Sequence, residues 1–369
     1  MSDSKRVLIA IATLTSTIIG TGFFILPYVA SQTGTWITLG YFGVLGGLVL
    51  LVHLMFSEVA LKTPDFLRLP GYAKLHLGKW GEKAAILSMI LGSYGTLLIY
   101  LIMGGTFLAN LLQPILGGST MLYTIIYYGL AVVLVYFGIK PLAKIDFADL
   151  IAFGIVMIIV FINGHQSWQV TNFLAPTNLK NIFLPYGPLL FAFWGATMIP
   201  EIEEMLKDKK EKLLKKTVFL SVIITVIFYL LFTILVTGIS GQATTPDAFS
   251  GLKSLLGSNM ATLGFILGII TILTSFAAVG ITLEKVFRYD FKMPKKFASA
   301  LVCSVPLILF FLGLRNFLEI IGLVGGVMMG IEGILILLMY KKIYPKKWWA
   351  WLLIIIFLLG VGYELIFNF

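Results

Sequence analysis

Long apolar stretches separated by short polar connections fill the sequence from end to end. Each stretch is long enough to cross a hydrocarbon layer of roughly 30 Å as a helix, which predicts an all-α polytopic membrane protein of about 11 transmembrane helices. We expect spans at residues 7–30, 35–61, 84–112, 120–139, 143–163, 183–205, 217–240, 259–287, 297–313, 316–340 and 348–367. The first stretch is longer than the core of a signal peptide, so we expect a retained span.

Composition and charge agree with this pattern. Hydrophobic residues make up 59% of the 369 residues and charged residues 12%, which is too much apolar surface for one water-soluble core. If the N-terminus is cytoplasmic, only Lys180, Lys253 and Arg315 of the 27 basic residues fall outside, as the positive-inside rule requires. The net charge of +10 therefore reflects the topology of a protein in a lipid bilayer, which we expect to be the cell membrane, and no nucleic acid partner is expected.

The connections between the spans leave no room for an enzymatic domain. No connection exceeds about 25 residues, and the chain holds no G-x-x-x-x-G-K-[ST] string for nucleotide binding. Since metal-ligand clusters and catalytic-triad spacings are also missing from the sequence, we expect no enzyme and no cofactor besides a coupling ion. The cytoplasmic connection 63–83 mixes apolar and basic side chains, which predicts a short helix at the membrane surface.

The first and sixth spans share a pattern of small residues. Gly22 precedes Pro27 by five residues, and Gly195 precedes Pro200 by the same interval, each within an apolar run. With five spans in each half, equivalent positions have opposite orientations in the membrane. The pattern predicts a single transporter domain over 1–369, built from inverted repeats at about 6–163 and 183–341 with an extra helix at 348–367.

Several strings resemble those of the amino acid/polyamine/organocation superfamily, and most closely those of the amino-acid/auxin and aromatic amino-acid permeases. The strings are TSTIIGTG at 15–22, LPY at 26–28, SEVA at 57–60, FAFWG at 191–195 and IPEI at 199–202. This resemblance covers essentially the whole chain. It implies a LeuT-type fold of five plus five spans with broken helices 1 and 6, and an amino acid as substrate.

The first predicted part of the substrate site lies in span 1. Gly20, Thr21 and Gly22 favour an unwound segment, since glycine tolerates non-helical backbone angles and lets a ligand approach the main chain. The helical half that restarts near Phe23 directs its amides and positive dipole end toward a substrate carboxylate. Ile19 completes this set. The alternative is that the small residues serve only close helix packing.

The second predicted part lies in span 6, at Phe191, Ala192, Phe193, Trp194 and Gly195. A break in the helix there offers carbonyl groups to the substrate ammonium and aromatic faces to its side chain. Phe193 and Trp194 are candidate gates, although aromatic residues at helical spacing also serve ordinary packing.

One further substrate contact follows from the resemblance alone. Tyr100 in span 3 resembles the tyrosine of the family that faces the substrate.

A candidate sodium site also follows from the resemblance. In sodium-coupled relatives a Thr-Ser pair of span 8 joins carbonyls of spans 1 and 8, and the matching positions are Ser16, Ile19, Thr271, Thr274 and Ser275. Alternatively, these hydroxyls bond back to carbonyls of their own helix.

The fifth span bears on which ion is used. Proton-coupled relatives can place a lysine of this span where sodium would sit, and the corresponding residue is Phe153. This departure favours sodium over that proton mechanism. His53 and Glu332 lie deeper in spans than the other ionisable residues and are alternative proton sites, which we do not include in the predicted site.

The sequence therefore predicts a secondary active transporter of amino acids that works by alternating access, coupled to sodium or, as the second choice, to protons. The runner-up is a membrane subunit that senses an amino acid without moving it, because the compact length and the string GTG at 20–22 also resemble spore-germinant receptor subunits. A channel is a third possibility, but the spans show no rings of charge. The pattern predicts no particular oligomeric state.

Overall fold

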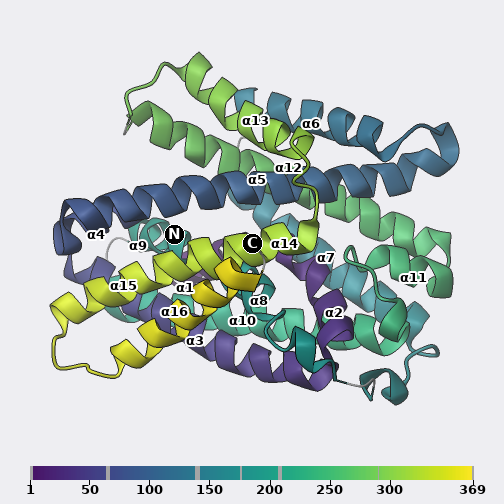
Figure 1. Cartoon of the computed structure of the whole chain (residues 1–369), viewed down its shortest axis with the longest axis horizontal. Helices are drawn as coiled ribbons and strands as arrows, with labels where there is room; N and C mark the ends of the chain where they lie inside the picture. The colour runs from purple at the N-terminus through teal and green to yellow at the C-terminus, as the bar shows by residue number, and fades with distance from the viewer. Residues whose placement is uncertain are drawn as a thin grey trace.

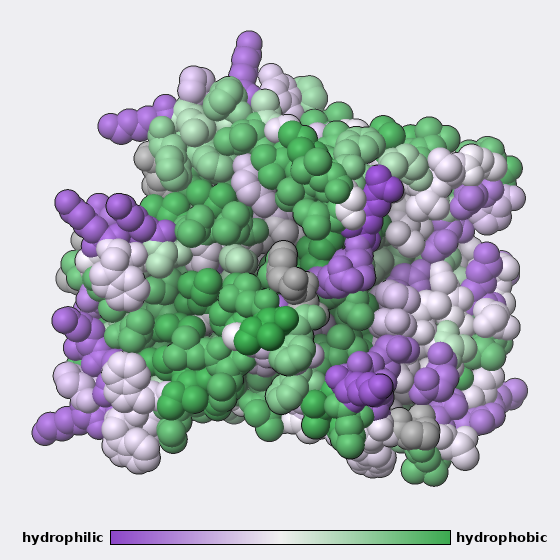
Figure 2. Space-filling view, in the orientation of Figure 1, coloured by the Kyte–Doolittle hydropathy of each residue, from purple (hydrophilic) through white to green (hydrophobic). Residues whose placement is uncertain are grey.

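The computed structural model describes residues 3–63, 67–137, 142–174, 177–206, 210–289 and 291–367, and every regular element within these ranges is a helix (Figure 1). The last two residues of the expected fourth span, 138–139, lie outside the described residues. Most helices follow the long axis of the molecule. Figure 2 shows a broad hydrophobic face bounded at both ends by hydrophilic side chains, as expected of a surface that faces lipid.

Each expected span coincides with one helix or with a group of consecutive helical segments. In chain order these are α1 (Asp3–Ile18) with α2 (Gly22–Thr33), α3 (Thr35–Lys62), α5 (Lys79–Leu116), α6 (Thr120–Phe137), α7 (Leu142–Gly164), α8 (Tyr186–Phe193) with η3 (Ala196–Met198) and α9 (Ile199–Met205), α10 (Lys210–Ser240), α12 (Ser258–Tyr289), α13 (Lys295–Phe311), α14 (Phe317–Leu323) with η5 (Val324–Met329) and α15 (Gly330–Ile343), and α16 (Ala350–Phe367).

The number of spans that length and composition alone identify is smaller. Among the described residues, 7 helices are long and apolar enough to cross a membrane, and the bent pair α1–α2 makes up to 8. The expected span 183–205 corresponds to interrupted helices, and the expected span 297–313 to the shorter helix α13. Eleven spans therefore stay a prediction, while an all-helical protein with several membrane-spanning helices is established.

The bundle has one end that is rich in lysine. α5 begins there with Lys79 and Lys83, and α15 ends there with Lys341 and Lys342. We call this the lysine-rich end; it is the end that the charge pattern assigns to the cytoplasm. The predicted short helix of the connection 63–83 is present as α4 (Leu69–Leu77), which packs against α5 and α15 at this end.

Span 1 is broken, as the sequence predicts. α1 ends at Ile18 and α2 begins at Gly22, and the two helices are bent by 52°. A Cβ atom added to Gly22 would lie 2.7 Å from the Cα atom of Ala192 in α8. Gly22 therefore allows α2 and α8 to pack backbone against backbone, so the packing function that we considered as an alternative operates here.

Span 6 is broken as well. α8 ends at Phe193, Trp194 has an extended backbone with φ −76° and ψ 123°, and the short segment η3 leads into α9. Pro200 lies in the first turn of α9, where its missing N–H group leaves no helical bond unmade. The two broken spans pack against each other through α2 and α8.

A third discontinuity, in span 10, was not predicted. η5 is a π-helical segment, and a Cβ atom added to its Gly325 would lie 2.0 Å from the carbonyl oxygen of Gly187. Glycine at this position allows η5 to approach α8 closely. Such π-helical turns are often found at functional sites.

Candidate functional site

The break in span 1 is held by a tyrosine from another span. The hydroxyl of Tyr229, in α10, accepts a hydrogen bond from the Gly20 N–H group at 3.2 Å and donates one to the Ile18 carbonyl at 2.8 Å. Tyr229 is fully buried. One side chain thus satisfies both a donor and an acceptor that the interrupted helix releases, which is what a break inside a membrane requires.

The break in span 6 is held by a histidine. Nε2 of His53, in α3, accepts a hydrogen bond from the Gly195 N–H group at 2.9 Å, and Nδ1 lies 2.8 Å from the Val49 carbonyl oxygen. Because Nε2 accepts, the ring proton belongs on Nδ1, where it can be donated to this carbonyl. The imidazole is therefore neutral in this arrangement.

The same break carries a buried contact between an indole and a carboxylate. Nε1 of Trp194 donates a hydrogen bond to Oε2 of Glu332 at 2.7 Å, and both residues are buried. The ring of His53 meets that of Trp194 edge to face, with centroids 5.3 Å apart. Trp194 thus connects His53 of α3 with Glu332 of α15, and the three side chains form one buried cluster at the break in span 6.

A cavity of about 160 Å³ lies between the two breaks. Its volume is close to that of the roughly 150 Å³ protein cavities that hold one benzene molecule. Among the predicted substrate residues, those that line it are Gly20, Gly22, Tyr100, Phe191, Ala192, Trp194 and Gly195. Glu332 also lines it, so the carboxylate that receives the indole N–H group faces the same space.

The cavity extends from the breaks toward the lysine-rich end. On α5 it runs from Tyr100 back through Thr96 and Ser93 to Met89, toward the start of the helix. Thr17 and Thr197 line it on the broken spans. A solute in this space would therefore meet hydroxyl groups on the path toward the end that the charge pattern assigns to the cytoplasm.

The opposite side of the breaks is filled by aromatic rings. The ring of Phe23 stacks on that of Phe232 with centroids 3.7 Å apart and lies 4.9 Å from that of Phe153. These residues belong to the aromatic cluster, which we define as Phe23, Phe24, Phe107, Phe153, Phe228, Phe232, Phe249 and Phe265. The cluster separates the cavity from the end opposite the lysine-rich end.

Four predicted substrate residues do not line the cavity. The side chain of Phe23 belongs to the aromatic cluster, and Phe193 packs between Phe42, at a centroid distance of 5.4 Å, and Tyr229, at 6.0 Å. Ile19 and Thr21 are buried beside the break. Their side chains take part in packing, and of the two candidate gates only Trp194 faces the cavity.

The predicted sodium ligands also lie outside the cavity lining. The Ser16 hydroxyl donates to the Thr13 carbonyl at 3.1 Å, and the Thr274 hydroxyl donates to the Thr271 carbonyl at 2.8 Å. These are the bonds within one helix that we considered as the alternative. Ser275 is placed differently, because its hydroxyl interacts with that of Tyr100, which lines the cavity.

Sequence reasoning did not identify the two side chains that hold the breaks. His53 was noted as an ionisable residue within a span, but not as a partner of span 6, and Tyr229 was not noted. A signal was nevertheless present in the spacing. His53 follows Gly20 by 33 residues and Tyr229 follows Gly195 by 34, so the two side chains lie at similar distances along the chain from the two breaks.

Comparisons with known proteins find a family model and a relative that match this sequence. The model of the family described as "Transmembrane amino acid transporter protein" matches residues 3–366. A relative from Haemophilus influenzae, "Tyrosine-specific transport system 1", is 25% identical over 285 residues, which cover 72% of this chain and 69% of the relative.

Two solved structures share the architecture. MhsT in complex with L-phenylalanine has a TM-score of 0.71 at 15% identity, covering 96% of this chain and 98% of that chain. Mhp1, a nucleobase-cation-symport-1 family transporter in a closed conformation with bromovinylhydantoin bound, has a TM-score of 0.63 at 14% identity, covering 89% and 76%. The likeness to MhsT confirms the expected LeuT-type fold.

The family resemblance seen in the sequence strings is confirmed as well, and its members are transporters and not enzymes. The match extends along nearly the whole chain. The protein therefore belongs to the transmembrane amino acid transporter family.

Proposed function

We propose that this protein is a secondary active transporter that carries aromatic amino acids across the cell membrane by alternating access. The observation that carries the proposal is the cavity between the two broken spans, which is large enough for one aromatic ring. The names of a tyrosine transporter and of a phenylalanine complex among its relatives support the same substrate class.

The helix ends at the two breaks are suited to the two charged groups of an amino acid. Gly22, at the N-terminal end of α2, lines the cavity, so its amide is the candidate donor to the substrate carboxylate. Phe191 and Ala192, at the C-terminal end of α8, offer carbonyl groups to the ammonium. The substrate side chain would then lie in the part of the cavity that Tyr100 and Trp194 line.

This conformation is consistent with one of the two states that an alternating-access cycle requires. The cavity extends toward the lysine-rich end, while the aromatic cluster fills the opposite side of the breaks. With the N-terminus in the cytoplasm, this state would be closed to the outside. Transport would then require the rings of the cluster to separate as the side toward the lysine-rich end closes.

Sodium remains the first candidate for the coupling ion, with Ser16, Ile19, Thr271, Thr274 and Ser275 as its ligands. A hydroxyl that donates to a carbonyl keeps lone pairs for a cation. The packing of Phe153 within the aromatic cluster leaves the fifth span without an ammonium group at that position.

One observation favours protons as the second candidate. Glu332 is a buried carboxylate that lines the cavity and receives the indole proton donor of Trp194. An ionisable group inside a membrane span is costly, and such a group therefore often marks a functional site. Protonation of Glu332 when substrate binds would give a way to couple transport to a proton gradient.

The single transporter domain and its inverted repeats are part of the proposal. The crossed contacts support them, since the second span of each half holds the break in the first span of the other half: His53 contacts Gly195, and Tyr229 contacts Gly20. An arrangement of this kind follows when two similar halves are related by a twofold axis in the membrane plane.

The test is uptake into liposomes that hold the purified full-length protein. Labelled tyrosine and phenylalanine are supplied with an inward sodium gradient, with potassium in place of sodium at fixed pH, and with a proton gradient. Accumulation driven by sodium or by protons would establish transport and the coupling ion together. Saturable binding without accumulation under any gradient would contradict transport and favour a sensor.

The sodium site has its own matched test. Thr274→Val with Ser275→Ala should remove sodium activation, whereas Thr282→Val, an exposed residue of the same helix whose hydroxyl also donates within α12, should retain it. Sodium activation that survives the double substitution would rule out this set of ligands.

A further inference from the structure

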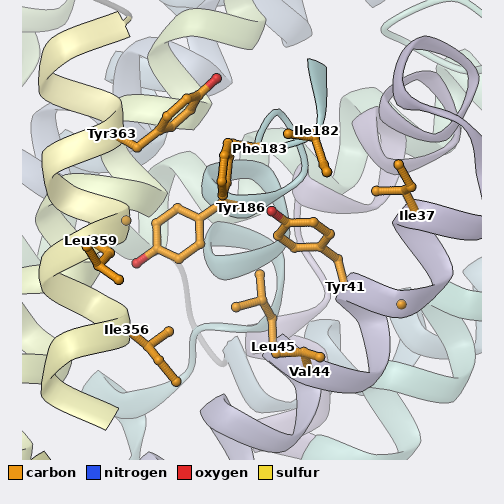
Figure 3. A pocket seen from close by; sticks show the side chains of 12 residues that line it. Ile37, Tyr41, Val44, Leu45, Ile182, Phe183, Tyr186, Ile356, Leu359 and Tyr363 are labelled. Atoms are coloured by element: carbon orange, nitrogen blue, oxygen red, sulfur yellow. The ribbon is translucent and has the colours of Figure 1, made fainter. Parts of the chain in front are cut away.

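A second cavity, larger than the one between the breaks, lies away from the substrate site on the side of the bundle. It is an apolar groove of about 620 Å³ between α3, α8 and α16 (Figure 3). Figure 3 shows three tyrosine rings, those of Tyr41, Tyr186 and Tyr363, around this space, together with aliphatic side chains from α3 and α16. We call it the lateral groove.

The lateral groove exists because α3 and α16 both pack against α8 but do not pack closely against each other. A Cβ atom added to Gly360 of α16 would lie 1.9 Å from the ring of Tyr186, so that glycine fixes the position of the ring. One turn further along the same face of α16, a Cβ atom added to Gly326 of η5 would lie 2.3 Å from Cγ of Glu364. These close contacts hold α16 in place beside η5 and α8 and keep the groove open.

The groove opens on the surface that faces lipid. Val44 and Leu359, which line it, have 64% and 70% of their area exposed. All three elements place it in the same half of the membrane. The lining residues lie near the start of α3, at the start of α8 and in the second half of α16, away from the lysine-rich end.

We propose that the lateral groove binds one acyl chain of a bilayer phospholipid, in the leaflet opposite the lysine-rich end. The groove is continuous with the lipid-facing surface, and its aliphatic and aromatic lining is suited to hydrocarbon. Tyr363 lies near the end of α16, and tyrosine side chains are enriched at the interface between membrane and water. An amino acid would leave its two charges unpaired in this lining.

The bound chain would contact the segment that leads to the break in span 6. Ile182, Phe183 and Tyr186 line the groove, and α8 continues from Tyr186 to the cavity residues Phe191 and Ala192. The chain would thereby support α8 from outside while α2 packs on its other side. This inference does not depend on which ion or amino acid the protein uses.

One glycine provides a way to fill the groove. Gly40 lines it, and a Cβ atom added there would meet no atom within 4 Å. Gly40→Leu should therefore place a side chain in the groove without disturbing the helices. Gly43→Leu is the matched control, because Gly43 is an exposed glycine of the same helix with equally open space and does not line the groove.

The experiment uses the full-length protein in nanodiscs that contain a phosphatidylcholine with a photoactivatable group in its acyl chain. Labelled peptides are mapped by mass spectrometry. We expect saturable labelling of 182–186 and 356–363 in the native protein and in Gly43→Leu. In Gly40→Leu this labelling should fall about tenfold, as when ~1.4 kcal/mol of apolar contact is lost.

Labelling of the exposed face of α6 serves as the internal reference, since ordinary surrounding lipid contacts it in every variant. The proposal is overturned if labelling of the groove peptides is unchanged by Gly40→Leu, is reduced equally by Gly43→Leu, or cannot be displaced by unlabelled phospholipid. Crosslinks between two copies of the chain through 356–363 would also overturn it, because the groove would then hold a second copy.

Discussion

The two broken spans solve the same problem with different side chains. At the break in span 1, the hydroxyl of Tyr229 satisfies one N–H group and one carbonyl group. At the break in span 6, His53 satisfies only the N–H group of Gly195, and its other nitrogen faces its own helix. Tyr229 therefore satisfies two main-chain groups at the first break, whereas His53 satisfies one at the second.

The difference bears on which span is expected to move more easily. Trp194, at the break where His53 satisfies one main-chain group, is also the aromatic residue that faces the cavity and donates to Glu332. Phe23, which follows the doubly held break, is packed in the aromatic cluster. We expect span 6 to respond to substrate and span 1 to act as the more rigid partner.

The largest effect is expected where the two broken spans touch. Gly22→Ala would place a methyl group 2.7 Å from the backbone of Ala192, so α2 must move away from α8. Overpacking of this kind costs about 1–3 kcal/mol, and uptake should fall by at least about tenfold. The measurement is the initial rate of uptake in liposomes at equal amounts of folded protein.

Gly20→Ala is the control for this substitution. The added methyl group at Gly20 would lie 3.6 Å from the Tyr100 hydroxyl, an ordinary contact distance. Most uptake should remain. Equal losses in Gly20→Ala and Gly22→Ala would show that the contact with Ala192 is not the cause.

Loss of the tyrosine should destabilise the protein next most strongly. Tyr229→Phe keeps the ring but leaves the Gly20 N–H group and the Ile18 carbonyl without this partner. Unsatisfied buried groups cost about 1–3 kcal/mol each, so two groups at the lower end of this range give a total of about 2 kcal/mol. Thermal unfolding in detergent measures it, with Tyr136→Phe, an exposed tyrosine of α6, as control.

Loss of the histidine should have a smaller effect. His53→Leu removes the only bond that it makes to span 6, and we expect a loss of about 1 kcal/mol. The double variant with Tyr229→Phe sharpens the comparison. Gly195 packs against Ile18, so the breaks touch, and a coupling of at least about 0.5 kcal/mol in the double-mutant cycle would show that they act as a unit. Strict additivity would contradict this.

The sequence allowed prediction of the broken spans but not of their partners. The length of each apolar run and the interval between glycine and proline are local signals, and they located the breaks beside Gly22 and Gly195. Which side chain reaches a break depends on contacts between segments far apart, as for Tyr229 and Gly20. The facing of Phe23 was equally hidden, because the 52° bend changes the direction of α2 and turns that ring into the aromatic cluster.

The smallest effect on stability, and the most informative on mechanism, is expected for Glu332→Gln. A glutamine carbonyl can still accept the hydrogen bond from the Trp194 indole, so the unfolding temperature should change little. If Glu332 carries the coupling proton, uptake driven by a proton gradient should be lost while exchange of labelled for unlabelled substrate continues, because exchange requires no net proton movement. If sodium is the coupling ion, sodium-driven uptake and exchange should both survive in the variant. Glu319→Gln, an exposed carboxylate at the start of α14, is the matched control and should behave as the native protein does. Loss of exchange together with accumulation would show instead that the carboxylate is needed to bind substrate, which would make the contact between Trp194 and Glu332 part of the substrate site.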